Sequence, residues 1–517
     1  MTKTVPLQQQ PRETLLRILR CLDLQSIVRF ARTCAKNHTL VFADSLLWRA
    51  LYRGAFPDSE SERQWLSRWQ FAAHGVNDCT KRLAPSEAAG DTFDWHTALR
   101  ARIDTEANWR SGDGKIHRYY ISDAQSSAAD NGNLLQREGT LRRMEVVGTT
   151  SWGAVLLVRP CCSLLAFRCG VDRCLQVLDA GISRPHVIGQ VMATDQIVVA
   201  SGNCSDATRQ FAVWIWQAHA LDSPARQIII GYHVELKSVR GGWLLGWSGA
   251  LGAKVDFTLY DLHQRTACHP VVRASVSACE FLDISKDGQP RVYVASMCGT
   301  SYRWQIKTAV PAPAADAENA DRTLGKLQSV VLDEGGMDMP HWRDRIIEVG
   351  RIDADRILVS ASDFRQGFSD VSVHCLSQQS ERMLWLQPCR RIGNDAVLLP
   401  ERHLALTTTT SPGKFGFVDM RTGEMKSSGV LESGFIFHRA IGTLVMAGNR
   451  RRRCLLFDTD SCTSLKETSE TLSKVGYALG GVAATYAIYI NQPGTICSVI
   501  DFFPATRRQY EAAVMIE

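Results

Sequence analysis

Residues 11–52 read PRETLLRILRCLDLQSIVRFARTCAKNHTLVFADSLLWRALY, and this stretch decides how the rest of the chain is interpreted. Its apolar residues recur at helical spacing in three groups, which predicts three short amphipathic helices with almost no chain between them. Pro11 lies in the first helical turn, Asp23 is the N-cap of the second helix, and Asp44 or Ser45 is the N-cap of the third. A unit of about forty residues is too small to bury so many apolar side chains within itself. We therefore expect its surplus apolar face to contact a partner protein.

The same stretch resembles an F-box over its whole length. The resemblance rests on Pro-x-Glu-x-Leu-Leu-x-Ile-Leu at the start, Leu-Asp and Cys-Ala-Lys in the middle, and Asp-Ser-Leu-Leu-Trp-Arg-x-Leu at the end. In that family the motif binds a small Skp-family adaptor, which connects it to a cullin–RING ubiquitin ligase. Gln10 and the pair Asn37-His38 depart from the family pattern, which has a hydrophobic residue and a basic-Trp pair there. The alternative is an ordinary amphipathic helical hairpin that covers the next domain.

The resemblance implies an F-box at residues 11–53, after a flexible N-terminus at residues 1–10. Its adaptor-binding surface is expected to be apolar. The residues predicted to form this surface are Pro11, Leu15, Leu16, Ile18, Leu19, Leu22, Ile27, Val28, Trp48 and Leu51.

The length and composition indicate a soluble multidomain protein. A chain of 517 residues is too long for one ordinary core, and charged residues at 22% argue against wholesale disorder. A net charge of +6 is mild over this length, so an argument for nucleic acid would need a clustered basic patch. No signal-type run opens the sequence, and no stretch reaches the roughly 18 apolar residues of a membrane span. We expect an intracellular protein, cytoplasmic and/or nuclear, without a membrane or nucleic-acid partner.

The sixteen cysteines do not follow a metal-binding pattern, because no CxxC pair occurs. Cys161, Cys162, Cys169 and Cys174 form the one cluster, and they lie in apolar, strand-like runs. Buried free thiols are therefore the favoured interpretation over a structural zinc site, and no metal or cofactor is expected.

Residues 54–112 are expected to form a helical linker. A first helix is predicted by Trp65, Leu66, Trp69 and Phe71. A second is predicted from Phe93 to about Asn108, and Gly112 follows its last turn. Its apolar face would contain Trp95, Leu99, Ile103 and Ala107.

The run from Trp95 to Gly112 resembles the segment that connects an F-box to a β-propeller in F-box/WD-repeat proteins. In those proteins the helix is a stiff spacer, and a tryptophan, here Trp109, anchors it to the first blade. The alternative is a surface helix of an ordinary domain.

From Lys115 the periodicity alternates, and one pattern recurs: two apolar or aromatic residues, then Asp or a polar residue, then a turn. Its third positions are separated by 36, 46, 44, 70, 44, 39 and 43 residues. This period is typical of four-stranded propeller blades. The pattern is found at 177–179, 213–215, 259–261, 303–305, 373–375, 417–419, 456–458 and 499–501.

The predicted fold is therefore α plus all-β: a three-helix F-box, a helical linker, and a seven- or eight-bladed β-propeller at residues 113–510. Eight blades are preferred, with the strand Lys115–Ile121 completing the last one. The long interval is attributed to a Pro/Ala-rich disordered insertion at about 308–326. Full Gly-His and Trp-Asp signatures are missing from most repeats, and a pair of β-sandwiches is the competing fold. Apolar runs that end in small residues are expected to be inner strands, at 196–201, 291–296, 356–361 and 443–448.

The sequence contains no catalytic constellation that would make the propeller an enzyme. It has no GxSxG, HExxH, Walker-type glycine loop or strand-linked GxGxxG, and its thirteen histidines are scattered. The repeated Asp residues follow the blade period, so we expect them to hydrogen-bond turns rather than to act as acids or bases.

Substrate recognition is predicted at the densest basic run. Guanidinium groups suit an acidic or phosphorylated degron, while a solvated turn (favoured) and a nuclear-localisation signal are alternatives. The predicted residues are Arg450, Arg451, Arg452, Arg453, Arg390 and Arg391.

Together these features predict a non-catalytic subunit of an SCF-type ubiquitin ligase. The F-box would bind the Skp-family adaptor and, through it, a cullin–RING scaffold, while the propeller would bind an unidentified protein substrate. An adaptor-bound scaffold without a role in degradation is the main alternative, and a propeller hydrolase or lyase is a weaker one.

Overall fold

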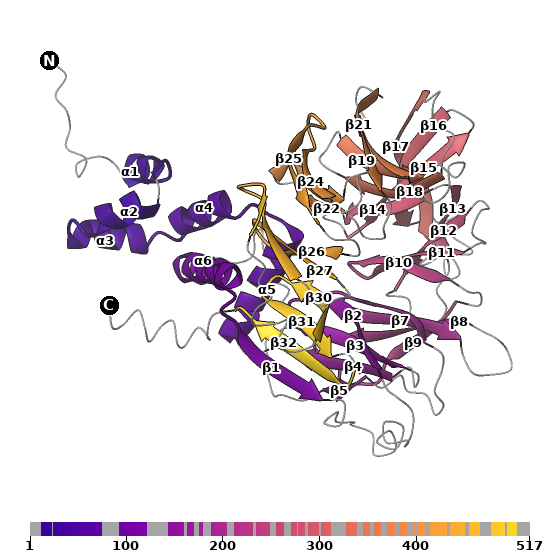
Figure 1. Cartoon of the computed structure of the whole chain (residues 1–517), viewed down its shortest axis with the longest axis horizontal. Helices are drawn as coiled ribbons and strands as arrows, with labels where there is room; N and C mark the ends of the chain where they lie inside the picture. Colours follow the sequence, from indigo (N-terminus) through magenta and orange to yellow (C-terminus); the bar gives the residue numbers. More distant parts are fainter. Residues whose placement is uncertain are drawn as a thin grey trace, which may run out of the picture.

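In the computed structural model, six helices precede a long series of strands (Figure 1). The helices are α1 (Arg12–Leu19), α2 (Leu24–Ala31), α3 (Ala35–Phe42), α4 (Ser45–Ala55), α5 (Glu60–His74) and α6 (Trp95–Ser111). The structure describes residues 12–22, 24–74, 93–120, 143–159, 163–169, 175–178, 188–203, 211–230, 234–248, 255–262, 270–276, 278–284, 288–298, 301–311, 327–338, 345–351, 356–362, 370–377, 382–390, 396–399, 402–408, 414–431, 435–449, 454–465, 477–491 and 494–503.

The N-terminal unit has four helices where the sequence predicts three. The additional helix is α3, whose sequence AKNHTLVF has a weak amphipathic pattern and several residues of low helix propensity. Packing against α2 and the burial of Val41 stabilise it instead. Asp44 is the N-cap of α4, as predicted, and its Oδ1 accepts a hydrogen bond from the Leu47 amide at 2.8 Å. Asp23 lies outside the described residues.

The described strands form eight four-stranded antiparallel sheets. The first sheet contains β2 (Arg143–Thr149), β3 (Gly153–Arg159), β4 (Ser163–Arg168) and β5 (Gln176–Val177), and the second contains β6 (Ile188–Ala193), β7 (Ile197–Asn203), β8 (Phe211–Gln217) and β9 (Arg226–Ile229). The third sheet contains β10 (Glu235–Arg240), β11 (Trp243–Ser248), β12 (Val255–Asp261) and β13 (Pro270–Val276), and the fourth contains β14 (Ala278–Ile284), β15 (Pro290–Cys298), β16 (Ser301–Pro311) and β17 (Leu327–Asp338). The fifth sheet contains β18 (Arg345–Arg351), β19 (Arg356–Ser362), β20 (Asp370–Ser377) and β21 (Arg382–Arg390), and the sixth contains β22 (Ala396–Leu399), β23 (Leu404–Thr408), β24 (Lys414–Asp419) and β25 (Met425–Val430). The seventh sheet contains β26 (Phe435–Ile441), β27 (Leu444–Asn449), β28 (Cys454–Asp458) and β29 (Thr463–Ser464), and the eighth contains β1 (Lys115–Tyr120), β32 (Ile496–Asp501), β31 (Tyr486–Asn491) and β30 (Tyr477–Ala483).

The sheets follow one another around a ring, which is the architecture of a β-propeller (Figure 1). The first strands of neighbouring sheets contact each other: β2 with β6, β6 with β10, β10 with β14, β14 with β18, β22 with β26, β26 with β30, and β30 with β2. Between the fifth and sixth sheets, β21 contacts β23.

The ring closes within the eighth sheet, which combines strands from two distant parts of the chain. β1 pairs with β32 in antiparallel register from Lys115 opposite Asp501 to Tyr120 opposite Ile496. This pairing confirms the prediction that the strand from Lys115 completes the last sheet. It also attaches the helices directly to the ring, because β1 follows α6 after three residues.

Two details of the repeat differ from the predictions. The recurring pattern lies on the third strand of each sheet except at its first occurrence, where Val177 belongs to β5, a fourth strand. The strands predicted to be innermost are the second strands β7, β15, β19 and β27. In β7, alternate residues belong to two different cores, so both faces of the strand are covered. β16 continues to Pro311 and pairs with β17, so residues 308–311 belong to a sheet. The rest of the predicted insertion, 312–326, lies outside the described residues.

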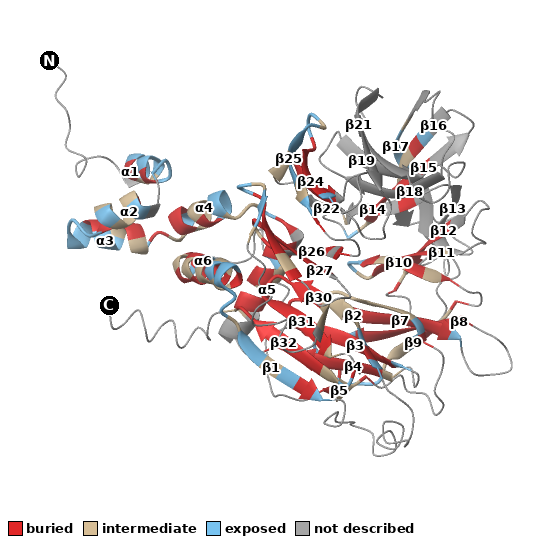
Figure 2. Ribbon diagram, in the orientation of Figure 1, coloured by how far each residue is buried: buried red, intermediate tan, exposed pale blue. Residues whose placement is uncertain are grey.

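One continuous apolar core connects the helices to the ring. It contains Leu19 of α1, Trp48 of α4, Trp65 of α5 and Trp95 of α6, together with side chains of the seventh and eighth sheets such as Leu444. Figure 2 shows buried segments continuing from α4, α5 and α6 into β26–β32, whereas exposed residues are frequent on α1 and α3. The F-box-like helices are therefore packed onto the ring through α5 and α6.

Candidate functional site

The first candidate site is the outer end of the helical unit, formed by α1–α3 and the start of α4. Three large apolar side chains are exposed there: Ile18 by 36%, Leu22 by 39% and Leu46 by 57%. Ile18 and Leu46 are exposed because the neighbouring positions Leu19 and Leu47 occupy the buried face of each amphipathic helix, whereas Leu22 lies in the turn after α1. Exposed apolar residues at the end of a protruding unit are suited to contact with a second protein.

The structure divides the predicted adaptor-binding residues into three groups. Ile18 and Leu22 are exposed, and Pro11 lies outside the described residues. Leu46 is also exposed but was not among the predicted residues. The sequence signal for its exposure is its position beside Leu47, which lies on the buried face of the same amphipathic helix. The buried members are Leu15, Leu19, Ile27 and Trp48, and the partly buried members are Leu16, Val28 and Leu51. We assign the buried group to holding the helices together, because it offers little surface to a partner in this conformation.

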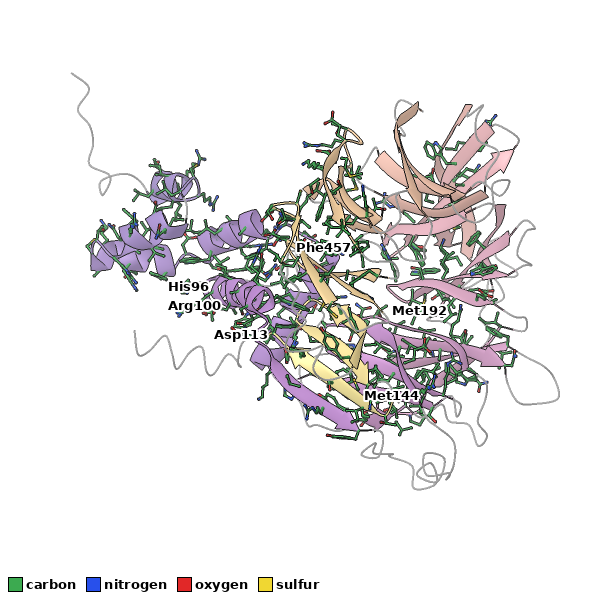
Figure 3. The ribbon with its side chains drawn as sticks, in the orientation of Figure 1. His96, Arg100, Asp113, Met144, Met192 and Phe457 are labelled. Carbon is green, nitrogen blue, oxygen red and sulfur yellow. The ribbon has the colours of Figure 1, made fainter. Side chains whose placement is uncertain are left out.

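Trp48 illustrates this internal role. Its Nε1 donates a hydrogen bond to the Val41 carbonyl at 2.9 Å, and its ring centroid lies 4.4 Å from that of His96. His96 is near the start of α6 (Figure 3) and also contacts the ring of Phe42, with centroids 4.9 Å apart. Burial lowers the pKa of His96. This aromatic cluster joins α3 and α4 to α6.

The second candidate site is the junction among α4, α5 and α6, where charged residues are buried and paired. Arg102 is fully buried, and its Nε donates to Glu62 at 2.9 Å while its Nη1 donates to Glu106 at 3.2 Å. Its guanidinium carbon lies 4.0 Å from the centre of the Phe56 ring, and the Tyr52 hydroxyl donates to Glu62. Burial and the Glu62 carboxylate raise the pKa of Tyr52 well above its usual range. This network connects the last F-box-like helix to both linker helices.

Two linker arginines bind equivalent positions in neighbouring sheets. Arg110 of α6 donates to Asp458 at 2.7 Å and to Thr443 at 2.9 Å. Arg68 of α5 donates in the same way to Asp501 and Thr485. Each aspartate ends the third strand of its sheet, and each threonine directly precedes the second strand. The repeat of the propeller therefore provides two matching attachment points for the linker.

Trp109 forms an apolar anchor between these arginines. Its Nε1 donates to the Ala484 carbonyl at 3.2 Å, and its ring stacks on Phe502 with centroids 4.0 Å apart. The expected anchoring role is observed, but the contact is with the eighth sheet and not the first, since β1 is the outermost strand of that sheet.

The expected apolar face of α6 is only half correct, because Ile103 and Ala107 are exposed. The face turned inward includes the polar residues Arg102 and Thr105, and Thr105 accepts a hydrogen bond from Trp65 at 3.0 Å.

Three of the repeated aspartates hold turns, as the sequence predicts. Asp419 accepts a hydrogen bond from the Arg421 amide at 2.8 Å, Asp458 from the Asp460 amide at 2.9 Å, and Asp501 from the Phe503 amide at 3.0 Å. Hydrogen bonds from Arg421 hold the pKa of Asp419 well below its usual range. These carboxylates therefore have a structural role.

The residues predicted to bind substrate are not described in full. Arg450–Arg453 and Arg391 lie outside the described residues, and Arg390 is the last residue of β21 with its side chain not described.

Of the cysteine cluster, Cys169 is described; it is buried, and burial raises its pKa to about 12. Within the described ranges, no group of His, Cys, Asp or Glu could hold a metal ion, and no helix is long and apolar enough to cross a membrane.

Comparison with known proteins gives a clear result for the N-terminal unit. Residues 9–54 match the F-box-like family model. The F-box-like domain is at the N-terminus.

Other comparisons give only distant matches. No curated protein matches the chain. Among solved structures it is similar to the Dos1 propeller, at 10% identity and a TM-score of 0.47 over 77% of this chain and 97% of that one. It is also similar to Sqt1 from Saccharomyces cerevisiae (10% identity, TM-score 0.45, covering 70% and 96%) and BamB from Moraxella catarrhalis (10% identity, TM-score 0.43, covering 68% and 95%).

Proposed function

We propose that this chain is the substrate-recognition subunit of an SCF-type ubiquitin ligase. The F-box-like match at residues 9–54 supports binding to a Skp-family adaptor and, through it, to a cullin–RING scaffold. The exposed side chains Ile18, Leu22 and Leu46 are the proposed apolar contacts. The propeller, which we propose to be eight-bladed and WD-repeat-like, would bind the substrate protein. We expect the complex to act in the cytoplasm and/or the nucleus.

The proposed mechanism is positional and not catalytic. A ligase transfers ubiquitin faster when a substrate lysine is held close to the charged ubiquitin, because the effective concentration rises. The junction of α5 and α6 supports this role: Arg68, Arg102 and Arg110 connect the helices to each other and to two sheets of the ring. A substrate on the ring would therefore keep a defined distance from the adaptor.

The decisive experiment is co-expression of the full chain with a Skp-family adaptor. We expect co-purification of a 1:1 complex, and we expect the triple variant Ile18→Asp, Leu22→Asp, Leu46→Asp to lose it while remaining folded. The same triple change to Ala should weaken binding less, because it removes apolar contact without placing charges in the interface. A complex unaffected by the Asp variant would refute this interface, and a wild-type chain that does not bind the adaptor would refute the proposed function.

The rival function, an adaptor-bound scaffold without a degradation role, differs in its effect on bound proteins. In cells expressing the Asp variant, a protein captured by the propeller should persist longer if the chain serves a ligase. An unchanged lifetime would favour the scaffold. Charge reversal at Arg450–Arg453, or at Arg390 and Arg391, tests whether these residues bind an acidic or phosphorylated segment of that protein.

A further inference from the structure

The segment from α1 to α4 holds nearly all of the chain's net positive charge. Residues 12–55 contain eight Lys or Arg and three Asp or Glu, a net charge of +5, whereas the whole chain of 517 residues carries +6. The remaining 473 residues are therefore almost neutral overall. The charge that appears mild when averaged over the chain is concentrated on one small unit.

Most of this charge is on the surface. The exposed cations described on α1–α3 and in the turns after α1 and α2 are Arg17, Arg20, Arg29, Arg32 and Lys36. Within the part of the chain that the structure describes, none of these five forms an ion pair. Glu13 is the one exposed carboxylate described on these three helices. The arginines of the junction, by contrast, have carboxylate partners.

These cations lie beside the exposed apolar residues. Arg17 and Ile18 are adjacent on α1, and Arg20 and Leu22 are close together in the turn that follows it. Figure 1 shows α1, α2 and α3 at the end of the molecule remote from the sheets, so the propeller does not cover them. An apolar centre with charges around it is the usual composition of a protein–protein interface.

We propose that the partner of this unit presents carboxylates around an apolar surface, and that the five cations guide it electrostatically into place. This inference rests on the proposed function and specifies the chemistry of the adaptor's facing surface. A protein partner is favoured over nucleic acid because, among the described residues of these helices, no exposed Phe, Tyr or Trp is interleaved with the arginines for base stacking. It is favoured over a lipid surface because the helices are short, at eight residues each, and expose few apolar side chains.

Charges at the edge of an interface mainly change the association rate and its dependence on salt. For the full chain and a purified Skp-family adaptor, the association rate should fall by about tenfold or more between roughly 0.1 M and 1 M NaCl, where the Debye length shrinks from about 10 Å to about 3 Å. The double variant Arg17→Glu, Arg29→Glu should slow association by about tenfold at the lower salt concentration and flatten the salt dependence. Its dissociation rate should change by less than about threefold.

The matched control is Lys115→Glu, Arg118→Glu on β1, which makes the same change in net charge at two exposed residues of the ring. It should leave the association rate within about twofold of wild type, because β1 belongs to the ring and lies apart from α1–α3 (Figure 1). Equal slowing by both double variants, or a rate that does not depend on salt, would overturn the proposal while leaving adaptor binding intact. Failure of the wild-type chain to bind the adaptor would instead count against the proposed function. Competition by a DNA duplex or by phosphatidylserine vesicles, at concentrations similar to those of the adaptor, would also overturn it in favour of a polyanion.

Discussion

The two ends of the helical unit use the same residue types in opposite ways. At the outer end, Ile18 and Leu22 are exposed, and Arg17 and Arg29 have no ion-pair partner among the described residues. At the junction with the ring, Arg68 and Arg102 are buried and paired with Asp501 and Glu62. The outer surface therefore leaves apolar side chains and cations exposed to solvent, whereas the junction buries its arginines beside carboxylate partners.

This difference indicates which end is available to a partner. A buried charged pair gains from its mutual attraction only if its geometry and hydrogen bonds are maintained, so the junction tolerates little movement. A partner can cover the exposed apolar residues and cations of the outer end without breaking contacts inside the protein, so this end is available for binding. The comparison leads to four predictions, from the largest expected effect to the smallest.

Breaking the junction at Glu62 should have the largest effect. Glu62→Leu leaves Arg102 without its closest carboxylate and the Tyr52 hydroxyl without its acceptor. We expect the free energy of unfolding to fall by about 3–5 kcal/mol, measured by denaturant titration of the full chain. The double variant Glu62→Leu, Arg102→Met should recover much of this loss, because it removes both charges. Equal losses in the single and double variants would show that the pair is not what stabilises the junction.

The two attachment points of the linker should differ in strength. Arg68 is buried, whereas the Arg110 side chain is 35% exposed, although both bind an Asp and a Thr at equivalent positions. Arg68→Met should lower the unfolding free energy by about 3 kcal/mol. Arg110→Met should lower it by about 1 kcal/mol, because solvent screens its ion pairs. The same titration measures both, and equal effects would mean that burial does not determine the strength of these contacts.

The neighbours Leu19 and Ile18 test the boundary between the two regions on a single helix. Leu19 is 2% exposed and belongs to the core shared with the ring. Leu19→Ala should lower the unfolding free energy by about 2–3 kcal/mol. Ile18→Ala should change it by less than about 0.5 kcal/mol. If Ile18→Ala is as destabilising as Leu19→Ala, Ile18 belongs to the core and not to the partner surface.

The smallest effect on stability is expected from lowering the pH. Burial lowers the pKa of His96 below that of the unfolded chain, so the neutral form stabilises the fold above a pH of about 6.5. This contribution is lost as the pH falls from that value through the folded-state pKa. The thermal midpoint of His96→Gln should therefore decrease less than that of wild type between pH 7.5 and 5, by differential scanning calorimetry. Equal decreases of the thermal midpoint in the two proteins would mean that groups other than His96 cause the loss of stability in acid.

The organisation of the chain could be predicted because it depends on local patterns. The F-box-like motif, the end of α6 at Gly112, and the repeated strands each occupy a short window of sequence. The turn-forming role of Asp458 and Asp501 follows from their period in the same way.

The junction could not be predicted because its contacts join residues far apart in the sequence. Arg102 lies between apolar neighbours on α6, and its pairing with Glu62 across 40 residues leaves no periodic signal. Trp48 was assigned to the adaptor surface for a similar reason, since one of the side chains that cover it, His96, comes from α6 and not from the F-box-like stretch itself. A surplus of apolar side chains in a short segment shows that another surface must pack against them. It does not show whether that surface belongs to the same chain or to a partner.

The closure of the ring has a consequence for how the protein is made. Arg68 is separated from Asp501 by 433 residues, so a ribosome must translate nearly the whole chain before that carboxylate exists. At roughly 5–20 residues per second this takes about 20–90 seconds. During this time the nascent helices have no sheet to pack against, so chaperones or an early-arriving adaptor would meet them first.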